Sequence, residues 1–198
     1  MRVWCIYLAA LLAFPAAAQT YPSRPVKLVV GFTPGGGVDI NARLLAPKLA
    51  DYLGQQFLVE NRPGAGTNIA NELVAKAPPD GYTLLVTTAA LAINMSLYAK
   101  LPFDAVRDFA PVSVFSESPN VLVTNAKLPV ASVKELVELA RQSPGRLNYS
   151  SAGIGTTQHL AAELLKLRTG TFIVHIPYKG TAPSLTGLIG GEVDLSFA

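Results

Sequence analysis

The sequence is poor in the residues that enzymes use for covalent and metal chemistry. Among its 198 residues there are one cysteine, Cys5, and two histidines, His159 and His175. It contains no Gly-x-Ser-x-Gly and no His-Glu-x-x-His stretch, so neither a serine-hydrolase nucleophile elbow nor a zinc-protease helix has support. These absences predict a protein without a metal site, a cofactor or hydrolase chemistry.

Charge is also scarce. Asp, Glu, Lys and Arg together make up 15% of the residues, and the formal net charge is +3. The basic residues are scattered rather than clustered, which argues against a nucleic-acid-binding surface. Because 50% of the residues are apolar, we expect a globular chain that is long enough for one large core or two small ones.

The first 18 residues have the pattern of a secretory signal. Arg2 precedes an apolar stretch over residues 3–14, and Pro-Ala-Ala-Ala at 15–18 has the small-residue pattern of a signal-peptidase site. The alternative is a single membrane anchor, but the apolar stretch is shorter than the ~20 residues that a span needs. Cys5 lies in this segment, so the expected mature chain has neither disulfides nor thiolate chemistry.

Beyond residue 18 the sequence predicts an α/β protein with mostly parallel sheets. Short β-branched runs alternate with longer segments in which apolar residues recur at helical spacing. The predicted strands are residues 26–32, 57–60, 83–87, 112–115, 121–124, 147–150, 172–176 and 193–197. The clearest predicted helices span residues 40–53, 133–140 and 160–167.

Two lobes are predicted, one over residues 19–120 and one over residues 121–198. The stretch Ser-Glu-Ser-Pro-Asn at 116–120 interrupts the alternation, and we place the crossing between lobes there. In the second half, Ser132 is the expected N-cap of a new helix. In the first predicted helix, Pro47 is expected to interrupt and bend the helix, because proline lacks the N–H that a helix interior needs.

Two glycine-rich turns each follow a predicted strand and precede a predicted helix. The first is Thr-Pro-Gly-Gly-Gly-Val-Asp at 33–39, and the second is Ser-Ala-Gly-Ile-Gly-Thr-Thr at 151–157. Such a turn gathers free backbone N–H groups at the positive end of a helix dipole, which is a site for an anion. One such turn in each half predicts a single ligand held between two lobes.

Three side chains near these turns have two interpretations each. Asp39 is either an N-cap or first-turn acid that offsets the helix dipole, or an acceptor for a ligand hydroxyl, amine or water. Arg43 either pairs with a ligand acid or is solvated or paired with Asp39. His159 is either a packed or capping group or a base, and no acid stands at a spacing that would clearly orient it.

Two further turns have either a cleft-lining or a purely connecting role. Residues 61–66, Asn-Arg-Pro-Gly-Ala-Gly, lead into a helix from Thr67 and either lend N–H groups to the cleft or only close a strand-to-helix connection. Residues 177–181, Pro-Tyr-Lys-Gly-Thr, either bring Tyr178 and Lys179 to a ligand or only end a strand.

From residue 21 onward these motifs resemble the receptor family of tripartite tricarboxylate transporters, the Bug or TctC-type periplasmic solute-binding proteins. The order and spacing of the matching stretches make the resemblance specific. These stretches lie at residues 22–26, 32–39, 60–66, 79–85, 101–104, 151–157, 159–163 and 177–180.

The resemblance implies a two-lobed fold of the type II periplasmic-binding-protein class, with the second lobe and the segment returning to the first lobe incomplete in this chain. It implies a monomeric periplasmic receptor that closes on a small organic carboxylate, with the membrane subunits of a tripartite tricarboxylate-type transporter as partners. No enzymatic activity is expected. The predicted ligand contacts are Thr33, Pro34, Gly35, Gly36, Gly37, Val38, Asp39, Gly66, Thr67, Thr88, Ser151, Ala152, Gly153, Gly155, Thr156, Thr157, His159, Tyr178 and Lys179.

The chain departs from the family pattern at Thr67 and Ala70, where the family often has glycine, and at Ala-Ala-Leu over 89–91, which is more apolar than usual. These departures predict a less polar pocket and a less charged ligand. One alternative function is a ligand sensor that reports to a membrane signalling partner. Another is a dinucleotide-binding enzyme, but Gly-Gly-Gly at 35–37 lacks the Gly-x-Gly-x-x-Gly spacing, and an export signal argues against a diffusible nicotinamide cofactor.

Overall fold

A computed structural model describes residues 20–198, and the predicted signal segment, residues 1–18 with Cys5, lies outside them. The first half contains β1 (Val26–Val30), α2 (Gly37–Leu53), β2 (Phe57–Asn61), a short 3-10 turn (Ala65–Thr67), α3 (Asn68–Ala75), β3 (Thr83–Val86) and α4 (Ala90–Leu97). The second half contains β4 (Leu122–Thr124), α5 (Val133–Gln142), β5 (Asn148–Ser151), α6 (Thr157–Thr169), β6 (Val174–Pro177), α7 (Thr181–Gly190) and β7 (Leu195–Phe197).

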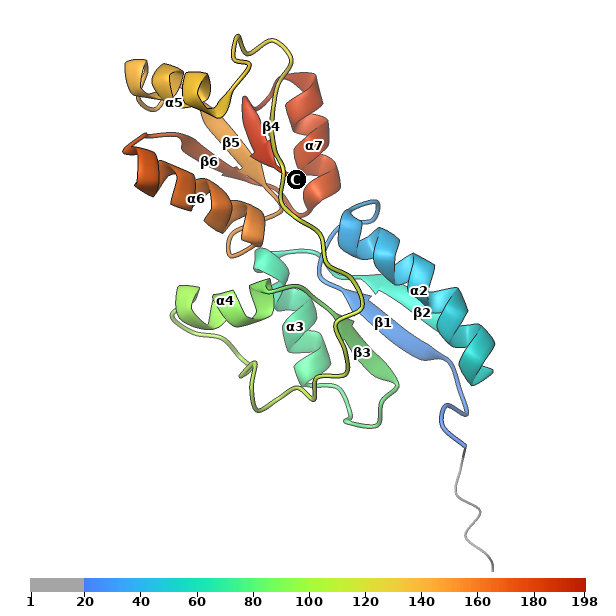
Figure 1. The fold of residues 1–198 in the computed structure, drawn as a ribbon. Coiled ribbons are helices and arrows are strands. Elements are labelled where there is room, and N and C mark those ends of the chain that lie inside the picture. The colour runs from blue at the N-terminus through green and yellow to red at the C-terminus, as the bar shows by residue number, and fades with distance from the viewer. Residues whose placement is uncertain (1–19) are drawn as a thin grey trace, which may run out of the picture.

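The strands form two separate sheets, one from each half (Figure 1). The first sheet has the order β2-β1-β3, and the second has the order β4-β7-β5-β6. Every pair of neighbours is parallel except β4 with β7, which confirms the predicted α/β class with mostly parallel sheets. None of the helices within residues 20–198 is long and apolar enough to cross a membrane.

Each sheet has its own apolar core. Strand β1 is central in its sheet, and four of its five residues are buried, as expected for a parallel strand covered on both faces. The first core consists of Val26, Leu28, Val30, Phe32, Ala42, Ala46, Phe57, Val86 and Ala152. The second core consists of Leu136, Ala140, Leu147, Tyr149, Ala162, Ile173 and Leu195. Ala152 belongs to the second predicted turn but packs in the first core, so the two halves are in direct contact.

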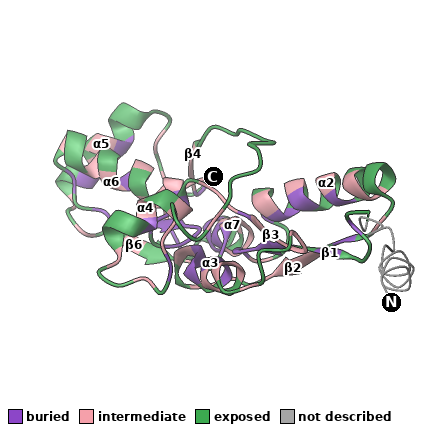
Figure 2. Cartoon of the chain, turned by 90° about the horizontal axis from the view of Figure 1, so that it is seen from below, coloured by how far each residue is buried: buried purple, intermediate pink, exposed green. Residues whose placement is uncertain are grey.

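The predicted strand at residues 112–115 is wrong. This segment is irregular and belongs to an exposed run, residues 111–121, that passes between the halves (Figures 1 and 2). Val112 and Val114 are 85% and 78% exposed. A β-branched run forms a strand only where another strand satisfies its backbone groups, and no strand among residues 20–198 pairs with this one.

The expectation that Pro47 interrupts the first helix is also wrong, because α2 continues through it from Gly37 to Leu53. Pro47 lies on the exposed side of the helix, as does Arg43 four residues earlier. On an exposed helix face, water can replace the N–H partner that proline removes, so the cost of Pro47 is small enough for the helix to continue. The predicted N-cap is confirmed, since the Ser132 side chain accepts a hydrogen bond from the Glu135 N–H.

Candidate functional site

The two predicted turns face each other at the junction of the two sheets. In a parallel sheet every strand-to-helix turn lies at the carboxyl edge, and the carboxyl edges of both sheets point toward the centre of the molecule (Figure 1). A small cavity of about 40 Å³ lies between them. Its lining consists of Phe32, Gly36, Gly37, Val38, Thr88, Thr157, Gln158 and Thr181.

Three helices begin at this cavity, with Gly37, Thr157 and Thr181 as their first residues. The first backbone N–H groups of a helix have no partner within the helix, and they carry the positive end of its dipole. Within residues 20–198, no hydrogen bond acceptor is found for the N–H groups of Gly37, Val38, Thr157 and Gln158. The cavity therefore has several free donors and a positive potential from backbone groups alone.

No charged side chain lines the cavity. Its polar side chains are the hydroxyls of Thr88, Thr157 and Thr181 and the amide of Gln158, which can donate hydrogen bonds without carrying charge. A volume of about 40 Å³ exceeds what one water molecule needs and suits a group of carboxylate size. Among the described residues, no cluster of three or more His, Cys, Asp and Glu side chains could hold a metal ion.

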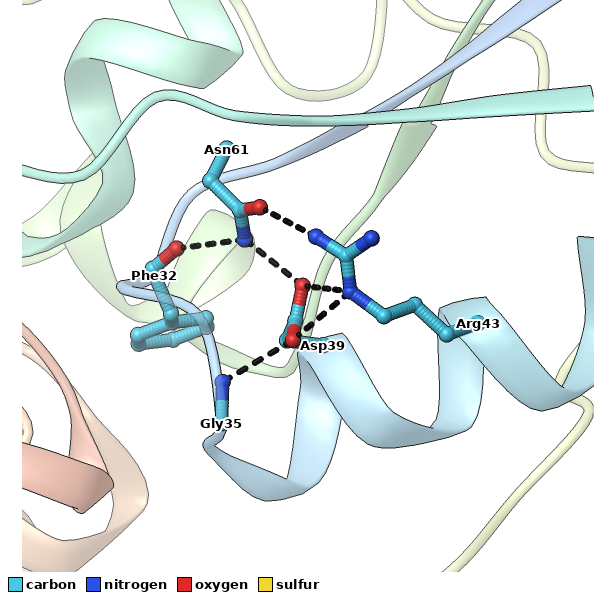
Figure 3. A network of polar contacts seen from close by, with 5 residues as sticks. All are labelled: Phe32, Gly35, Asp39, Arg43 and Asn61. Atoms are coloured by element: carbon cyan, nitrogen blue, oxygen red, sulfur yellow. Dashed lines mark hydrogen bonds and ion pairs between the residues drawn. The ribbon is translucent and has the colours of Figure 1, made fainter.

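Asp39 supports the first turn from inside (Figure 3). Asp39 is 2% exposed, and its carboxylate accepts hydrogen bonds from the Gly35 N–H at 2.9 Å, from the Arg43 guanidinium at 3.0 Å and from the Asn61 amide at 2.8 Å. Asn61 also donates to the Phe32 carbonyl at 3.0 Å. The carboxylate thus ties the glycine turn to α2 and to the end of β2.

Asp39 is a first-turn acid and not the N-cap, which is Gly36. Burial alone would raise the pKa of the Asp39 carboxyl, but the hydrogen bonds from Arg43, Gly35 and Asn61 outweigh it and lower that pKa below its ordinary value. Arg43 is paired with Asp39, which is one of the two arrangements expected from the sequence.

The hydroxyl groups of the second turn hold the turn itself. The Thr156 Oγ1 caps α6 by accepting from the His159 N–H at 3.4 Å, and it donates to the Gly153 carbonyl at 2.7 Å. The Ser151 Oγ accepts from the Gly153 N–H at 3.1 Å. Because Ser151 and Thr156 are both buried, Thr157 is the hydroxyl of this turn that reaches the cavity.

Glycines allow the two halves to come into close contact. A Cβ on Gly66 would overlap the Ile154 carbonyl, and a Cβ on Gly155 would overlap the Asn94 side chain. A Cβ on Gly180 would likewise overlap the Thr33 hydroxyl. Beside this last contact, the Thr33 N–H donates to the Lys179 carbonyl at 3.2 Å, which is a direct hydrogen bond between the halves.

The cavity thus brings together five of the predicted contacts, namely Gly36, Gly37, Val38, Thr88 and Thr157. The other predicted turn residues that take part in hydrogen bonds within the turns are Gly35, Asp39, Ser151, Gly153, Gly155 and Thr156. Tyr178 donates to Glu192 at 3.1 Å, and the exposed Lys179 approaches the junction through its backbone carbonyl. Gly66 packs against the second turn, and Thr67 is buried beneath it in a left-handed conformation with φ +79°.

Sequence reasoning missed three lining residues, Phe32, Gln158 and Thr181. Gln158 is the second residue of α6, where N–H groups are also free. Thr181 follows Gly180 and opens α7 after β6, so it repeats the strand, glycine turn and helix order of the two recognised turns. That order is the signal that could have found it.

We expect Asp39→Asn to destabilise the protein by about 2 kcal/mol at pH 7, since hydrogen bonds to a buried charged group are each worth about 1.5–3 kcal/mol. The lowered pKa of Asp39 means that its contribution is present above pH ~4 and is lost as the pH falls through the folded-state pKa. Urea denaturation at pH 7 and pH 3 should show the difference shrinking in acid. Asp51→Asn, an exposed site on α2, is the control, and a loss at Asp39 that is independent of pH would contradict the assignment.

We expect Gly66→Ala to hold the two halves apart. Alanine in the left-handed conformation costs about 1–2 kcal/mol, and Gly54→Ala has the same cost, since Gly54 has φ +71° but open space around it. Urea denaturation should therefore show a loss of about 1–2 kcal/mol for Gly54→Ala and a loss at least as large for Gly66→Ala, whose Cβ also overlaps the Ile154 carbonyl. Small-angle X-ray scattering should show a larger radius of gyration for Gly66→Ala only; equal radii would mean that the contact with Ile154 yields without separating the halves.

Comparison with known proteins supports the resemblance seen in the sequence. The model of the family described as "Tripartite tricarboxylate transporter family receptor" matches residues 41–198. Protein BugT of Bordetella pertussis is 44% identical over 191 residues, which cover 95% of this chain and 59% of BugT.

Two solved structures are also similar. Rpa4515 of R. palustris, solved with adipate, has a TM-score of 0.86 at 44% identity, covering 89% of this chain and 60% of that one. The periplasmic binding protein BugD has a TM-score of 0.86 at 37% identity, and the match covers 89% of this chain and 59% of BugD. This chain therefore has a periplasmic-binding-protein fold and spans about three fifths of the length of these relatives. It belongs to the receptor family of tripartite tricarboxylate transporters.

Proposed function

We propose that this protein is a periplasmic receptor that captures a small organic carboxylate between its two halves for uptake by a tripartite tricarboxylate-type transporter. The observation that carries the proposal is the convergence of three helix N-termini, with free N–H groups, on one cavity. Backbone donors at helix starts bind carboxylates without help from a cation. The chain's role in this proposal is binding and release, with no catalytic step and no cofactor.

The proposed contacts divide into ligand-facing groups and supports. The N–H groups of Gly37 and Val38 bind from the first half, and those of Thr157 and Gln158 bind from the second, with the hydroxyls of Thr88 and Thr181 beside them. Asp39, Ser151 and Thr156 hold the turns in place. Since both halves contribute, ligand binding favours the arrangement in which they are in contact.

The proposed ligand is a mono- or dicarboxylate rather than a tricarboxylate. The cavity lining has no charged side chain, so each further carboxylate would lose its hydration without a cation to compensate. Phe32, Val38 and the glycines make much of the wall apolar or uncharged. The presence of adipate, a dicarboxylate, in the similar Rpa4515 structure supports this size and charge class.

Location and partners complete the proposal. The secretory-signal pattern of residues 1–18 and the similarity to periplasmic binding proteins support export to the periplasm. There a receptor meets the membrane subunits of its transporter, and the arrangement with both halves in contact is the form that those subunits would recognise.

The function is tested by thermal melts and calorimetry of the purified protein with acetate, malate, adipate and citrate. A ligand at 100 times its dissociation constant adds about 2.7 kcal/mol to the free energy of unfolding, which raises the melting midpoint by several degrees. We expect malate or adipate to stabilise the protein more than citrate does. A clear preference for citrate, or no shift with any acid, would contradict the proposal.

The role of the backbone donors is tested at Gly37, the first residue of α2. Proline fits the first helical position but has no N–H, whereas alanine keeps the N–H and meets no atom within 4 Å. We expect Gly37→Pro to weaken binding of the best acid of the panel roughly tenfold to a hundredfold, the value of one hydrogen bond to a charged group. Gly37→Ala should bind like the original protein in the same calorimetry; equal affinities for the two variants would exclude this N–H as a ligand contact.

A further inference from the structure

Behind the second turn lies a stack of three rings that the proposed function does not explain. His175 on β6 stacks between Tyr149 of β5 and His159 of α6, with ring centroids 4.6 Å and 4.4 Å apart. His159 is in the first turn of α6 and belongs to none of the residues that line the cavity. The stack therefore lies beside the turn and does not line the cavity.

Both histidines are bonded to the turn. The Gly155 N–H donates to the Nδ1 of His159 at 3.3 Å, and the Nε2 of His175 lies 2.7 Å from the Ser151 Oγ. Ser151 in turn accepts from the Gly153 N–H. The imidazoles thus hold both glycines of the turn, one directly and one through a hydroxyl.

The bond to Gly155 fixes the proton state of His159. An imidazole nitrogen accepts a hydrogen bond only when it carries no proton, and both nitrogens are donors in the charged form. Protonation of His159 on Nδ1 would therefore place two donors against each other and break this bond. By contrast, the contact of His175 with Ser151 survives protonation, because a hydroxyl both donates and accepts.

The surroundings disfavour protonation of both histidines. Burial lowers the pKa of both imidazoles, that of His175 to about 4 with the neighbouring His159 as a further cause. The charged groups that face the stack are Glu163, which favours protonation, and Lys166, which opposes it, both from α6. Glu163 is already bonded at 2.6 Å to both Lys166 and the Tyr149 hydroxyl from β5, so its charge is largely compensated. Burial therefore sets the direction in which the pKa values of the two histidines shift.

We propose that His159 is a positioning residue for the second turn, which holds Gly155 in place only while its Nδ1 is free of a proton, with stacked His175 shielding it from water. The effect of His159 on ligand binding rests on the proposed function, because His159 acts through the turn that would bind the carboxylate. The effect of His159 on the conformation of the turn is independent of the proposed function.

The first test needs no ligand. We expect the Gly155 amide resonance, followed by NMR from pH 8 to pH 4.5, to titrate with the same midpoint as the His159 ring. His175→Gln helps to assign that ring, because the chain has only two histidines. In His159→Asn, whose amide oxygen can replace Nδ1 but takes up no proton, the Gly155 resonance should not depend on pH over this range. A Gly155 resonance that ignores the His159 titration, or titrates unchanged in His159→Asn, would overturn the proposal.

The second test uses adipate as the probe at pH 7.5. One neutral hydrogen bond is worth about 0.5–1.5 kcal/mol, so His159→Leu should weaken adipate binding by roughly twofold to tenfold. His159→Asn should stay close to the original affinity. If the original protein binds adipate and His159→Leu binds it equally well, the positioning role is overturned. If the original protein binds none of the acids in the panel while Gly155 still follows His159, the proposed function fails and the coupling within the turn stands.

Discussion

The constraint on which this structure depends is that unpaired N–H groups at several helix starts face one another across a small space. Parallel strands send every strand-to-helix turn to the same edge of a sheet, and here the turns of two sheets meet at one cavity. Groups of the same partial charge repel, and an N–H group that gives up water without gaining an acceptor loses about 1–3 kcal/mol. Contact between the halves is therefore costly unless an anion or water fills the space, and an anion also compensates the dipoles.

The N–H groups at the helix starts stay free because other polar groups hold each turn on the side away from the cavity. In the first turn, Asp39 accepts the Gly35 N–H and is itself held by Arg43 and Asn61. In the second, Ser151 and Thr156 hold Gly153 while His159 holds Gly155. Because the protein's own groups make these bonds, no ligand atom is needed to hold the turns. A site that is already ordered has a smaller conformational-entropy cost when it binds its ligand.

The parts of the site that depend on local sequence could be predicted. The parts that depend on contacts between residues far apart in the sequence could not. The two glycine turns and the cap at Ser132 are local patterns, and the alternation of strands and helices gives the fold class. The bond from Asn61 to Asp39 joins residues on β2 and α2, so only the packing of that helix on its sheet reveals it. Residues 112–115 have strand composition but lack a partner strand among residues 20–198, and composition alone does not show that.

The division of roles between backbone and side chains bears on how such a receptor selects its ligand. Free N–H groups recognise a carboxylate but not the rest of the molecule that carries it, since the contact ends at two oxygens. Any discrimination must come from side chains at the wall, such as Phe32, Thr88 and Gln158. Substitutions at those positions leave the helix starts unchanged, because no side chain makes the backbone donors. Under the proposed function, a chain of this fold can therefore change its preferred acid while keeping the same way of holding the carboxylate.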